Sequence, residues 1–438
     1  MLPGTQVWSR ARTKALFNEE QRHIAPGLQT IALLSELAIE RGTGSTLTDL
    51  DGNTYLDLNA GVSVASLGHA HPKYVAALSA QLGQVTVGSF TTRARADLAK
   101  LFAELTPGGL DRVQFFSGGA EAVEAGIKLA RSFTKRTDVI AFTGGFHGKT
   151  AGVLPISDVG WKNAVGPLPT GYHHCPFPDT TRFKGSAEQC AAASLDALDK
   201  IIKSIPGGPA VIIIEPIQGT AGNLIPPAGF LGKIAEMAHA AGALFFADEM
   251  ICGFGRTGLM FGVNHEGVVP DIMTTGKGMA SGFPMSALVS TSAIMAAEPF
   301  SLPSASSSSY GGNPLAAAAG LVTIRTIMED GLVDNSAQIG RLFLDGLTKI
   351  AARRKSIANV RGRGLLIGFD MVVDNQAADF TMMPKESCVK FFMECLANGV
   401  IMMGYTPRVR VHPPLILTAE EASQALSVID AALGHLEA

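Results

Sequence analysis

The stretch ALFFADEMICGFGRTG, residues 243–258, decides the fold of this chain. Its first five residues form an uninterrupted apolar run, which is typical of a strand buried on both faces of a sheet. Asp248 and Glu249 follow where the strand ends, and a glycine-rich segment comes next. Open α/β sheets bind ligands at the carboxyl ends of their strands. The stretch therefore predicts a buried parallel strand that carries an acidic side chain into a ligand site.

The second half of the stretch, GFGRTG (253–258), also fits the dinucleotide pattern G-x-G-x-x-G. That pattern needs a helix that starts in its last glycines, because the phosphate binds free N–H groups at a helix N-terminus. The segment that follows, LMFGVNHEGVVPD (259–271), contains Gly262, Gly267 and Pro270 and has no helical period. We therefore interpret GFGRTG as a loop that leads away from the site, with Arg256 tying it down.

Short apolar strands alternate with helices on either side of this stretch. RVQFF (112–116) precedes the helical pattern AEAVEAGIKLARSF (120–133), and AVIIIEP (210–216) is a further apolar strand. FLGKIAEMAHAAG (230–242) is an amphipathic helix that ends at a glycine. Buried strands that alternate with helices predict an α/β fold with a mainly parallel central sheet wrapped by helices.

The two ends of the chain have a different pattern. LTDLDGNTYLDL (47–58) predicts a hairpin around the turn DGN, and the segments at 359–372 and 408–418 look like strands of a smaller α+β domain. We expect the N-terminal hairpin to belong with this C-terminal part. The prediction is an N-terminal segment 1–60 of the small domain, a large domain 61–325, and a C-terminal small domain 326–438.

Composition narrows the classes of partner. The 438 residues carry a net charge of −3, so nothing favours binding to nucleic acid or to an anionic membrane. Apolar residues make up 47%, yet no apolar stretch is long enough to span a bilayer. The five cysteines form no C-x-x-C pair and no metal-ligand spacing, which predicts free thiols, no metal site and a cytoplasmic location.

Two glycine-rich turns after strands are candidate ligand contacts. In FFSGGAEA (115–122), Gly118 and Gly119 let the backbone approach a ligand, and Ala120 opens a helix whose free N–H groups would bind a phosphate. In GGFHG (144–148), Phe146 places an aromatic ring in a turn. Each turn alone is also an ordinary connection between strand and helix.

Three further features lie downstream. Lys277 stands between glycines in DIMTTGKGMASGFP (271–284), a tight apolar loop that suits Schiff-base chemistry. Ser309 offers a hydroxyl in SSYGGNP (308–314), and RVRVHPPL (408–415) offers arginines that can bind a carboxylate. A phosphate site, an aromatic plate, an acid for a ring nitrogen and a Schiff-base lysine are what pyridoxal phosphate requires.

In this order, the motifs resemble the class III (ω-type) aminotransferases of pyridoxal-phosphate fold type I. The resemblance runs from TLTDLDGNTYLDLNAGVSVASLGHAHP (46–72) to VRVHPPL (409–415). Its most specific blocks are FFADEMICGFGRTGLMFG (245–262) and PDIMTTGKGMASGFPMSALV (270–289). It implies a pyridoxal-phosphate enzyme whose large domain binds the cofactor. It also implies a homodimer with shared active sites, or a tetramer.

The resemblance implies a role for each matching residue around the cofactor. Lys277 would form the Schiff base, and Asp248 would pair with the pyridine nitrogen. Phe146 would stack on one face of the ring and Met250 would pack on the other. The turn of Gly118, Gly119 and Ala120 would hold the phosphate, and Ser309 would reach the phosphate of the neighbouring subunit.

On the substrate side, Glu215 and Gln218 match the motif EPxQG and would lie near the ring hydroxyl and the substrate. Arg410 matches the arginine that binds the substrate carboxylate. Thr220 departs from the family, because the 4-aminobutyrate and ornithine enzymes have a glutamate there that is thought to pair with this arginine. This departure argues against a 2-oxoglutarate-switching enzyme without excluding it.

The expected activity moves an amino group from an amino acid, ω-amino acid or amine to a 2-oxo acid, such as pyruvate or 2-oxoglutarate. An amino-acid racemase or epimerase on the same scaffold is the alternative, because FHGKTAGVLPISD (146–158) is similar to stretches in such enzymes. The sequence does not identify the donor or the acceptor.

Overall fold

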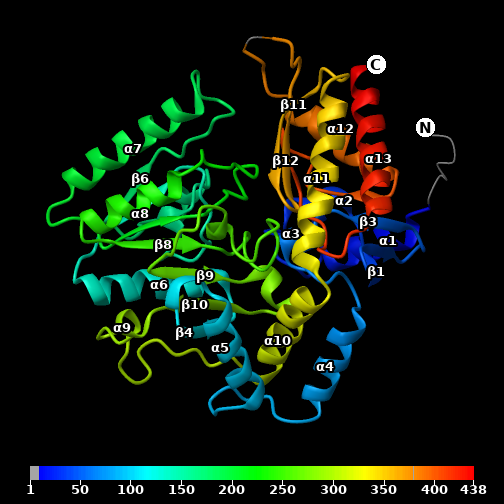
Figure 1. The fold of residues 1–438 in the computed structure, drawn as a ribbon. Coiled ribbons are helices and arrows are strands. Elements are labelled where there is room, and N and C mark those ends of the chain that lie inside the picture. Colours follow the sequence, from blue (N-terminus) through cyan, green and yellow to red (C-terminus); the bar gives the residue numbers. More distant parts are fainter. Residues whose placement is uncertain (1–8, 378) are drawn as a thin grey trace.

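The structure is a computed structural model that describes residues 9–377 and 379–438. Residues 1–8, which begin the predicted segment 1–60, and residue 378 lie outside this description. Figure 1 shows two groups of elements: a central sheet with its helices, and a second group that contains both described ends of the chain.

Seven strands form the central sheet in the order β4-β10-β9-β8-β7-β5-β6. Strands β9, β8, β7, β5 and β6 are parallel to one another, whereas β10 runs antiparallel to both β9 and β4. The prediction of a mainly parallel sheet is therefore confirmed. The strands are β4 (Arg112–Phe116), β5 (Val139–Phe142), β6 (Tyr172–Cys175), β7 (Val211–Ile214), β8 (Leu244–Asp248), β9 (Ile272–Thr275) and β10 (Ser286–Ser290).

Strand β7 shows why helices cover both faces of this sheet. Successive side chains of a strand point to opposite faces, so an all-apolar strand must be covered on each. Val211 and Ile213 pack in one apolar cluster with helix α6, whereas Ile212 and Ile214 pack in another with α7 and α8. Figure 1 shows α6 on one side of the sheet and α7 and α8 on the other. These helices are α6 (Gly119–Thr134), α7 (Ala187–Ser204) and α8 (Phe230–Ala240).

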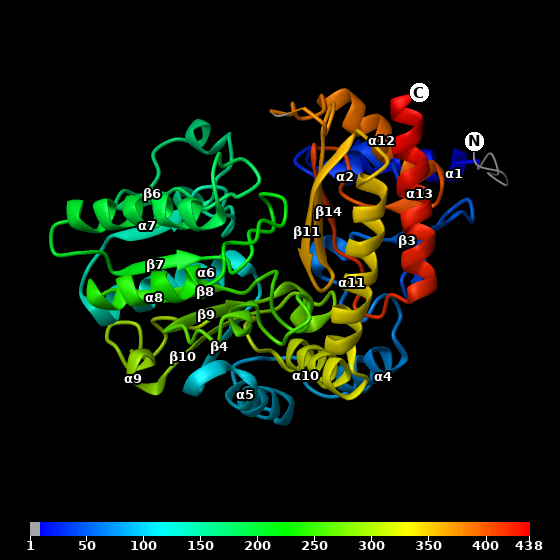
Figure 2. The same cartoon turned by 45° about the horizontal axis from the view of Figure 1, so that its top comes forward.

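The N-terminal hairpin pairs with a C-terminal strand. In the sheet β1-β2-β3-β13, β3 runs parallel to β13, with Leu56 opposite Val400. Figures 1 and 2 show these blue strands beside the orange and red C-terminal helices. The pairing supports the proposed union of segments 1–60 and 326–438, whose boundaries stay predictions. The strands are β1 (Ile39–Thr43), β2 (Thr46–Asp49), β3 (Thr54–Asp57) and β13 (Val400–Ile401).

A second small sheet lies in the same group of elements, in the order β11-β12-β14. Helices α11, α12 and α13 pack on it or on one another, and Thr418 caps α13, since its hydroxyl accepts from the N–H of Glu421. Within the described residues, no helix is long and apolar enough to cross a membrane. The elements are β11 (Ile357–Arg363), β12 (Leu366–Met371), β14 (Arg408–Val411), α11 (Leu332–Ala351), α12 (Lys385–Ala397) and α13 (Ala419–Glu437).

The contact between α6 and strand β8 gives a prediction about packing. A Cβ added at Gly126 of α6 would lie 2.5 Å from Cε1 of Phe246, whereas one added at Gly232 of α8 would meet its nearest atom, in Val268, at 3.9 Å. We expect Gly126→Ala to lower the free energy of unfolding by about 1–3 kcal/mol through overpacking. Gly232→Ala, the matched control, should raise it by about 0.5–1 kcal/mol because alanine favours the helix.

Thermal unfolding midpoints of the two variants and the wild type, measured at one scan rate, test this pair. If Gly126→Ala were as stable as Gly232→Ala, the close packing of α6 on β8 would be wrong.

Candidate active site

A cavity of about 320 Å³ lies where β8 and β9 end. The N-terminus of α6 and the turn after β5 also contribute to its wall. This is the edge of the sheet at which the sequence places a ligand site. Of the predicted site residues, six line this one cavity: Gly119, Ala120, Phe146, Asp248, Met250 and Lys277.

Asp248 is fully buried at the end of β8, and protein donors surround its carboxylate. Oδ1 accepts from the backbone N–H of Met250 and from the hydroxyl of Thr274, both at 3.1 Å. Oδ2 accepts from Nδ1 of His147 at 2.7 Å. A buried carboxylate with three donors is held in one orientation.

His147 is a site residue that the sequence analysis did not single out. Burial alone would lower the pKa of its imidazole, but the hydrogen bond to Asp248 and the charge of that carboxylate outweigh burial and raise the pKa. The only local signal was its position next to Phe146 in GGFHG. Its partner lies 101 residues away, so no sequence spacing shows the pair.

The N-terminus of α6 has free backbone donors. Glu121 Oε2 accepts from the N–H groups of Ser117 and Gly118, at 3.0 and 2.7 Å. The N–H groups of Gly119 and Ala120 donate to no acceptor in the described part of the chain. A helix N-terminus with unpaired N–H groups binds anions, so this end of the cavity fits a phosphate.

Lys277 follows β9 and begins the short 3-10 helix η5 (Lys277–Ala280). Its backbone is left-handed, with φ of +43°, which is a strained conformation for a residue other than glycine. The side chain is half-buried, and Nζ has no hydrogen bond or ion pair with any described residue. Met250 packs close by, since a Cβ at Gly276 would lie 2.6 Å from its sulfur.

Glu215 and Gln218 lie behind the turn of Phe146 and do not line the cavity. Glu215 accepts from the N–H of Phe146 at 2.8 Å and from that of Gly219 at 3.1 Å. Burial and the nearby charge of Asp248 raise the pKa of the Glu215 carboxyl. The amide of Gln218 donates to the carbonyl of Thr143 at 2.9 Å, so both residues fix the turn that carries the aromatic ring.

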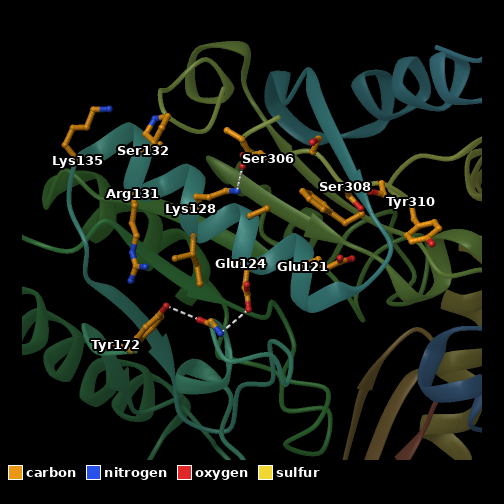
Figure 3. Close-up of a pocket in the computed structure, with 18 residues that line it drawn as sticks. Glu121, Glu124, Lys128, Arg131, Ser132, Lys135, Tyr172, Ser306, Ser308 and Tyr310 are labelled. Atoms are coloured by element: carbon orange, nitrogen blue, oxygen red, sulfur yellow. Dashed lines mark hydrogen bonds between the residues drawn. The ribbon is translucent and has the colours of Figure 1, made fainter. Parts of the chain in front are cut away.

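Ser309 lines a different and larger cavity of about 900 Å³, together with Glu121 of α6. Figure 3 shows Glu121, Glu124 and Lys128 of this helix at that cavity. Lys128 and Lys135 also line it, but each donates to a backbone carbonyl, at 2.9 and 2.6 Å. Arg131 donates to a carbonyl and covers the ring of Tyr172. These cations hold neighbouring loops, and Ser309 is not brought to the cavity of Lys277 in the same chain.

Arg410, the predicted carboxylate-binding residue, lies on β14. Its guanidinium makes no hydrogen bond or ion pair with a described residue, and burial lowers its pKa. Tyr405 and, to a smaller extent, Glu215 act on it electrostatically and oppose the lowering of this pKa.

Comparisons with known proteins agree with this geometry. The family model described as "Aminotransferase class-III" matches residues 31–433. The chain belongs to the class-III aminotransferases. It is 36% identical to the acetylornithine aminotransferase of Methanothermobacter thermautotrophicus over 91% of this chain and 93% of that one. It is 34% identical to the 4-aminobutyrate aminotransferase of Mycobacterium leprae over 90% of each.

Solved transaminases share the fold. An (S)-enantioselective omega-transaminase from Thermomicrobium roseum is similar at a TM-score of 0.89 and 29% identity, over 98% of this chain and 100% of that chain. An amine transaminase from an uncultivated Pseudomonas species, solved with pyridoxal phosphate bound, has a TM-score of 0.86 and 28% identity, over 94% and 98%. The predicted pyridoxal-phosphate fold type I is therefore confirmed.

The cavity of this class-III aminotransferase fits its cofactor, pyridoxal phosphate. The free N–H groups suit a phosphate, the oriented carboxylate suits a protonated ring nitrogen, and the unpaired lysine in the same cavity suits an aldehyde. A Cβ at Gly119 would lie 3.2 Å from the sulfur of Met250, so a side chain there would crowd the phosphate end.

The pair of His147 and Asp248 predicts a pH-dependent stability. Because the pKa of His147 is raised on folding, the stabilisation from its charge is complete below its unfolded pKa of about 6.5 and is lost as pH rises through the folded pKa. We expect His147→Asn to lower the thermal midpoint of the cofactor-free protein more at about pH 6 than at about pH 9.

The control is His239→Asn, since His239 also pairs with an aspartate but is exposed to water, where such pairs contribute little. If the difference in thermal midpoint between wild type and His147→Asn stayed constant with pH, the ring of His147 would carry no charge that stabilises the fold.

Proposed function

We propose that Lys277 is the Schiff-base lysine of this aminotransferase and that Asp248 is the partner of the cofactor's ring nitrogen. The observation that carries the proposal is that the unpaired Nζ of Lys277 lies in the same cavity as the buried carboxylate of Asp248. That carboxylate accepts three hydrogen bonds. A lysine without a salt bridge in a half-buried site is free to react as an amine.

The other proposed contacts with the cofactor come from residues in the walls of the cavity and behind them. The N–H groups of Gly119 and Ala120, with Gly118 as the cap of α6, would bind the phosphate. Phe146 would stack on one face of the ring and Met250 would pack on the other. His147 supports Asp248, and Glu215 with Gln218 supports the turn of Phe146.

When bound, pyridoxal phosphate withdraws electrons from the bonds at the substrate Cα. Asp248 would stabilise a proton on the ring nitrogen, because its carboxylate is held in place by three donors and shielded from water. Lys277 would hold the cofactor through Nζ, and the same nitrogen, once the substrate amine has replaced it on the cofactor, would accept and return the proton of the substrate Cα. Arg410 would orient the substrate by its carboxylate.

The names of similar enzymes support a class of amino donor for this chain. Acetylornithine, 4-aminobutyrate and putrescine appear in the names of similar enzymes, so an amino acid, ω-amino acid or amine is the proposed donor class. A 2-oxo acid such as pyruvate or 2-oxoglutarate is the proposed acceptor. The relatives named here are aminotransferases, and nothing supports the alternative of a racemase.

We also propose a homodimer with shared active sites, located in the cytoplasm. The placement of Ser309 outside the cavity of its own Lys277 supports a contact with the phosphate of a neighbouring subunit. A tetramer built from such dimers agrees equally well with the position of Ser309.

The test removes the amine of Lys277. We expect Lys277→Ala, reconstituted with pyridoxal phosphate, to lose the visible absorption band and to lose amino transfer by at least about 1,000-fold, since no group remains to hold the aldehyde or to move the proton. Borohydride reduction followed by mass spectrometry should fix the cofactor to the peptide of Lys277 in the wild type and to no peptide in the variant.

Lys349→Ala, an exposed change on α11, is the matched control and should keep the band and the activity. Cofactor attached to another lysine of the wild type would overturn the assignment of Lys277.

A further inference from the structure

Arg408 of β14 is an arginine whose carboxylate partner lies within the chain. Its Nη2 donates to Oδ2 of Asp179 at 2.6 Å and to the hydroxyl of Thr181 at 3.1 Å. Its Nη1 donates to the carbonyl of Ala221 at 3.0 Å. A planar guanidinium can hold two acceptors in one fixed geometry. Arg408 therefore ties two segments that are distant in sequence to β14.

The ion pair of Arg408 and Asp179 is partly buried, since 16% and 21% of the two side chains are exposed. Burial raises the pKa of the Asp179 carboxyl, but the hydrogen bonds from Thr181 and Arg408 outweigh burial and lower the pKa. Asp179 therefore remains charged, and removal of Arg408 would leave it partly buried without its counter-ion. This differs from an exposed pair on the surface, which contributes little.

The loop 218–224 is a closed unit that packs against the small sheet β11-β12-β14. Its first and last residues exchange two backbone hydrogen bonds, both at 3.0 Å. Arg361 of β11 donates through Nε to the carbonyl of Gly222 at 2.8 Å. A Cβ added at Gly222, where φ is +112°, would lie only 2.9 Å from Cβ of Arg408. The loop therefore cannot move far without moving the small sheet.

The two segments that the guanidinium ties together also meet at Thr143, where the turn that carries Phe146 begins. The amide of Gln218, in the loop, donates to the carbonyl of Thr143 at 2.9 Å. From the other segment, the N–H of Phe177 donates to the hydroxyl of Thr143 at 3.1 Å. Both oxygens of one turn residue are therefore held by segments whose position depends on β14.

The loop also contacts the turn closer to its aromatic ring. A Cβ added at Gly144 would lie 2.7 Å from Oε1 of Gln218 and 3.2 Å from Cβ of Ala221. Glu215 accepts from the N–H of Phe146 at 2.8 Å and from an N–H of the loop at 3.1 Å. The turn of Phe146 is thus packed on the loop and hydrogen-bonded to it, so a shift of one shifts the other.

We infer that Arg408 is a positioning residue for the cofactor ring, because its tie to Asp179 and Ala221 fixes the turn of Phe146 from the side of the small sheet. The inference rests on the proposed function, in which Phe146 stacks on that ring. Arg408 does not line the cavity of Lys277, so it acts only through the turn. Without the tie, the aromatic ring loses its fixed place, and small errors of position slow a reaction strongly.

The variant Arg408→Met tests the inference on the holoenzyme, since it keeps the apolar stem and removes the guanidinium. We expect the Kd for pyridoxal phosphate, measured by equilibrium dialysis, to rise about 5-fold through weaker stacking. The circular dichroism of the visible cofactor band should change, because the ring is held differently. We expect kcat to fall about 10-fold while KM changes by less than about 3-fold.

The variant Asp179→Asn removes the same ion pair without shortening a side chain. It should move the cofactor Kd and the dichroism in the same direction as Arg408→Met, and it provides the test if Arg408→Met does not fold. An unchanged Kd and an unchanged band in the folded variants would overturn the inference.

The matched control is Arg354→Met. Arg354 pairs with Asp430 of α13 at 2.9 Å, and 28% and 24% of these side chains are exposed, but this pair holds α13 and not the turn of Phe146. The control should lower the thermal midpoint without changing the cofactor Kd or the dichroism. If Arg354→Met altered both as much as Arg408→Met does, the effect would be one of general stability, and the inference would be wrong.

A double-mutant cycle shows whether Arg408 acts through Phe146. In Phe146→Leu there is no aromatic ring to hold, so adding Arg408→Met should change the cofactor Kd by less than about 2-fold. A further rise of about 5-fold in this background would show that the two residues act independently, which contradicts the inference.

The same cycle separates this inference from the proposed function. If Phe146→Leu alone bound the cofactor as tightly as the wild type, the proposed stacking of Phe146 would be wrong, and the inference would fail with it. If Phe146→Leu weakened binding but Arg408→Met did not, the proposed function would stand and the inference alone would fail.

Discussion

The buried carboxylate of Asp248 is the constraint on which the site depends. Removing a carboxylate from water costs several kcal/mol unless charged and hydrogen-bonding partners replace the water. Here the partners come from three segments: His147 from the turn after β5, Thr274 from β9, and the backbone of Met250 after β8. Satisfying one charge therefore fixes the relative positions of three walls of the cavity.

Met250 links that charge to the rest of the cavity. Its N–H orients Asp248, while its sulfur packs where side chains at Gly119 and Gly276 would collide with it. One residue thus sets the spacing between the helix N-terminus at one end and Lys277 at the other. The glycines before and after the strands are explained by this packing at least as well as by the flexibility of a loop.

Much of the architecture could be predicted from local patterns. The apolar runs predicted β4, β7 and β8 of the central sheet. The tie formed by Arg256 was also predicted, and it donates to the carbonyls of Leu365 and Pro413. The strand signals lie in short segments whose conformation depends little on distant residues, whereas the two carbonyls that Arg256 binds lie 109 and 157 residues away from it.

The pairs that were missed connect distant parts of the chain. His147 with Asp248 and His412 with Asn223 are separated by 101 and 189 residues, and each histidine is an unremarkable letter within its own motif. The difference between Arg410 and its flanking residues was likewise hidden, because RVRVH shows the alternation but not which side chain finds a partner. Only the fold brings Asn223 beside His412 and the carbonyl of Ala221 beside Arg408.

The two charged ends of the site are built differently. At the cofactor end, the chain supplies both Asp248 and the donors that balance it, so this part is complete before any substrate binds. At the substrate end, Arg408 is paired with Asp179 while Arg410 is left without an acid. A site discriminates most strongly where its own groups are unsatisfied, because only the correct ligand removes the cost of that unpaired group. If Arg410 binds the substrate as proposed, its unpaired guanidinium is the place where the site would select a carboxylate.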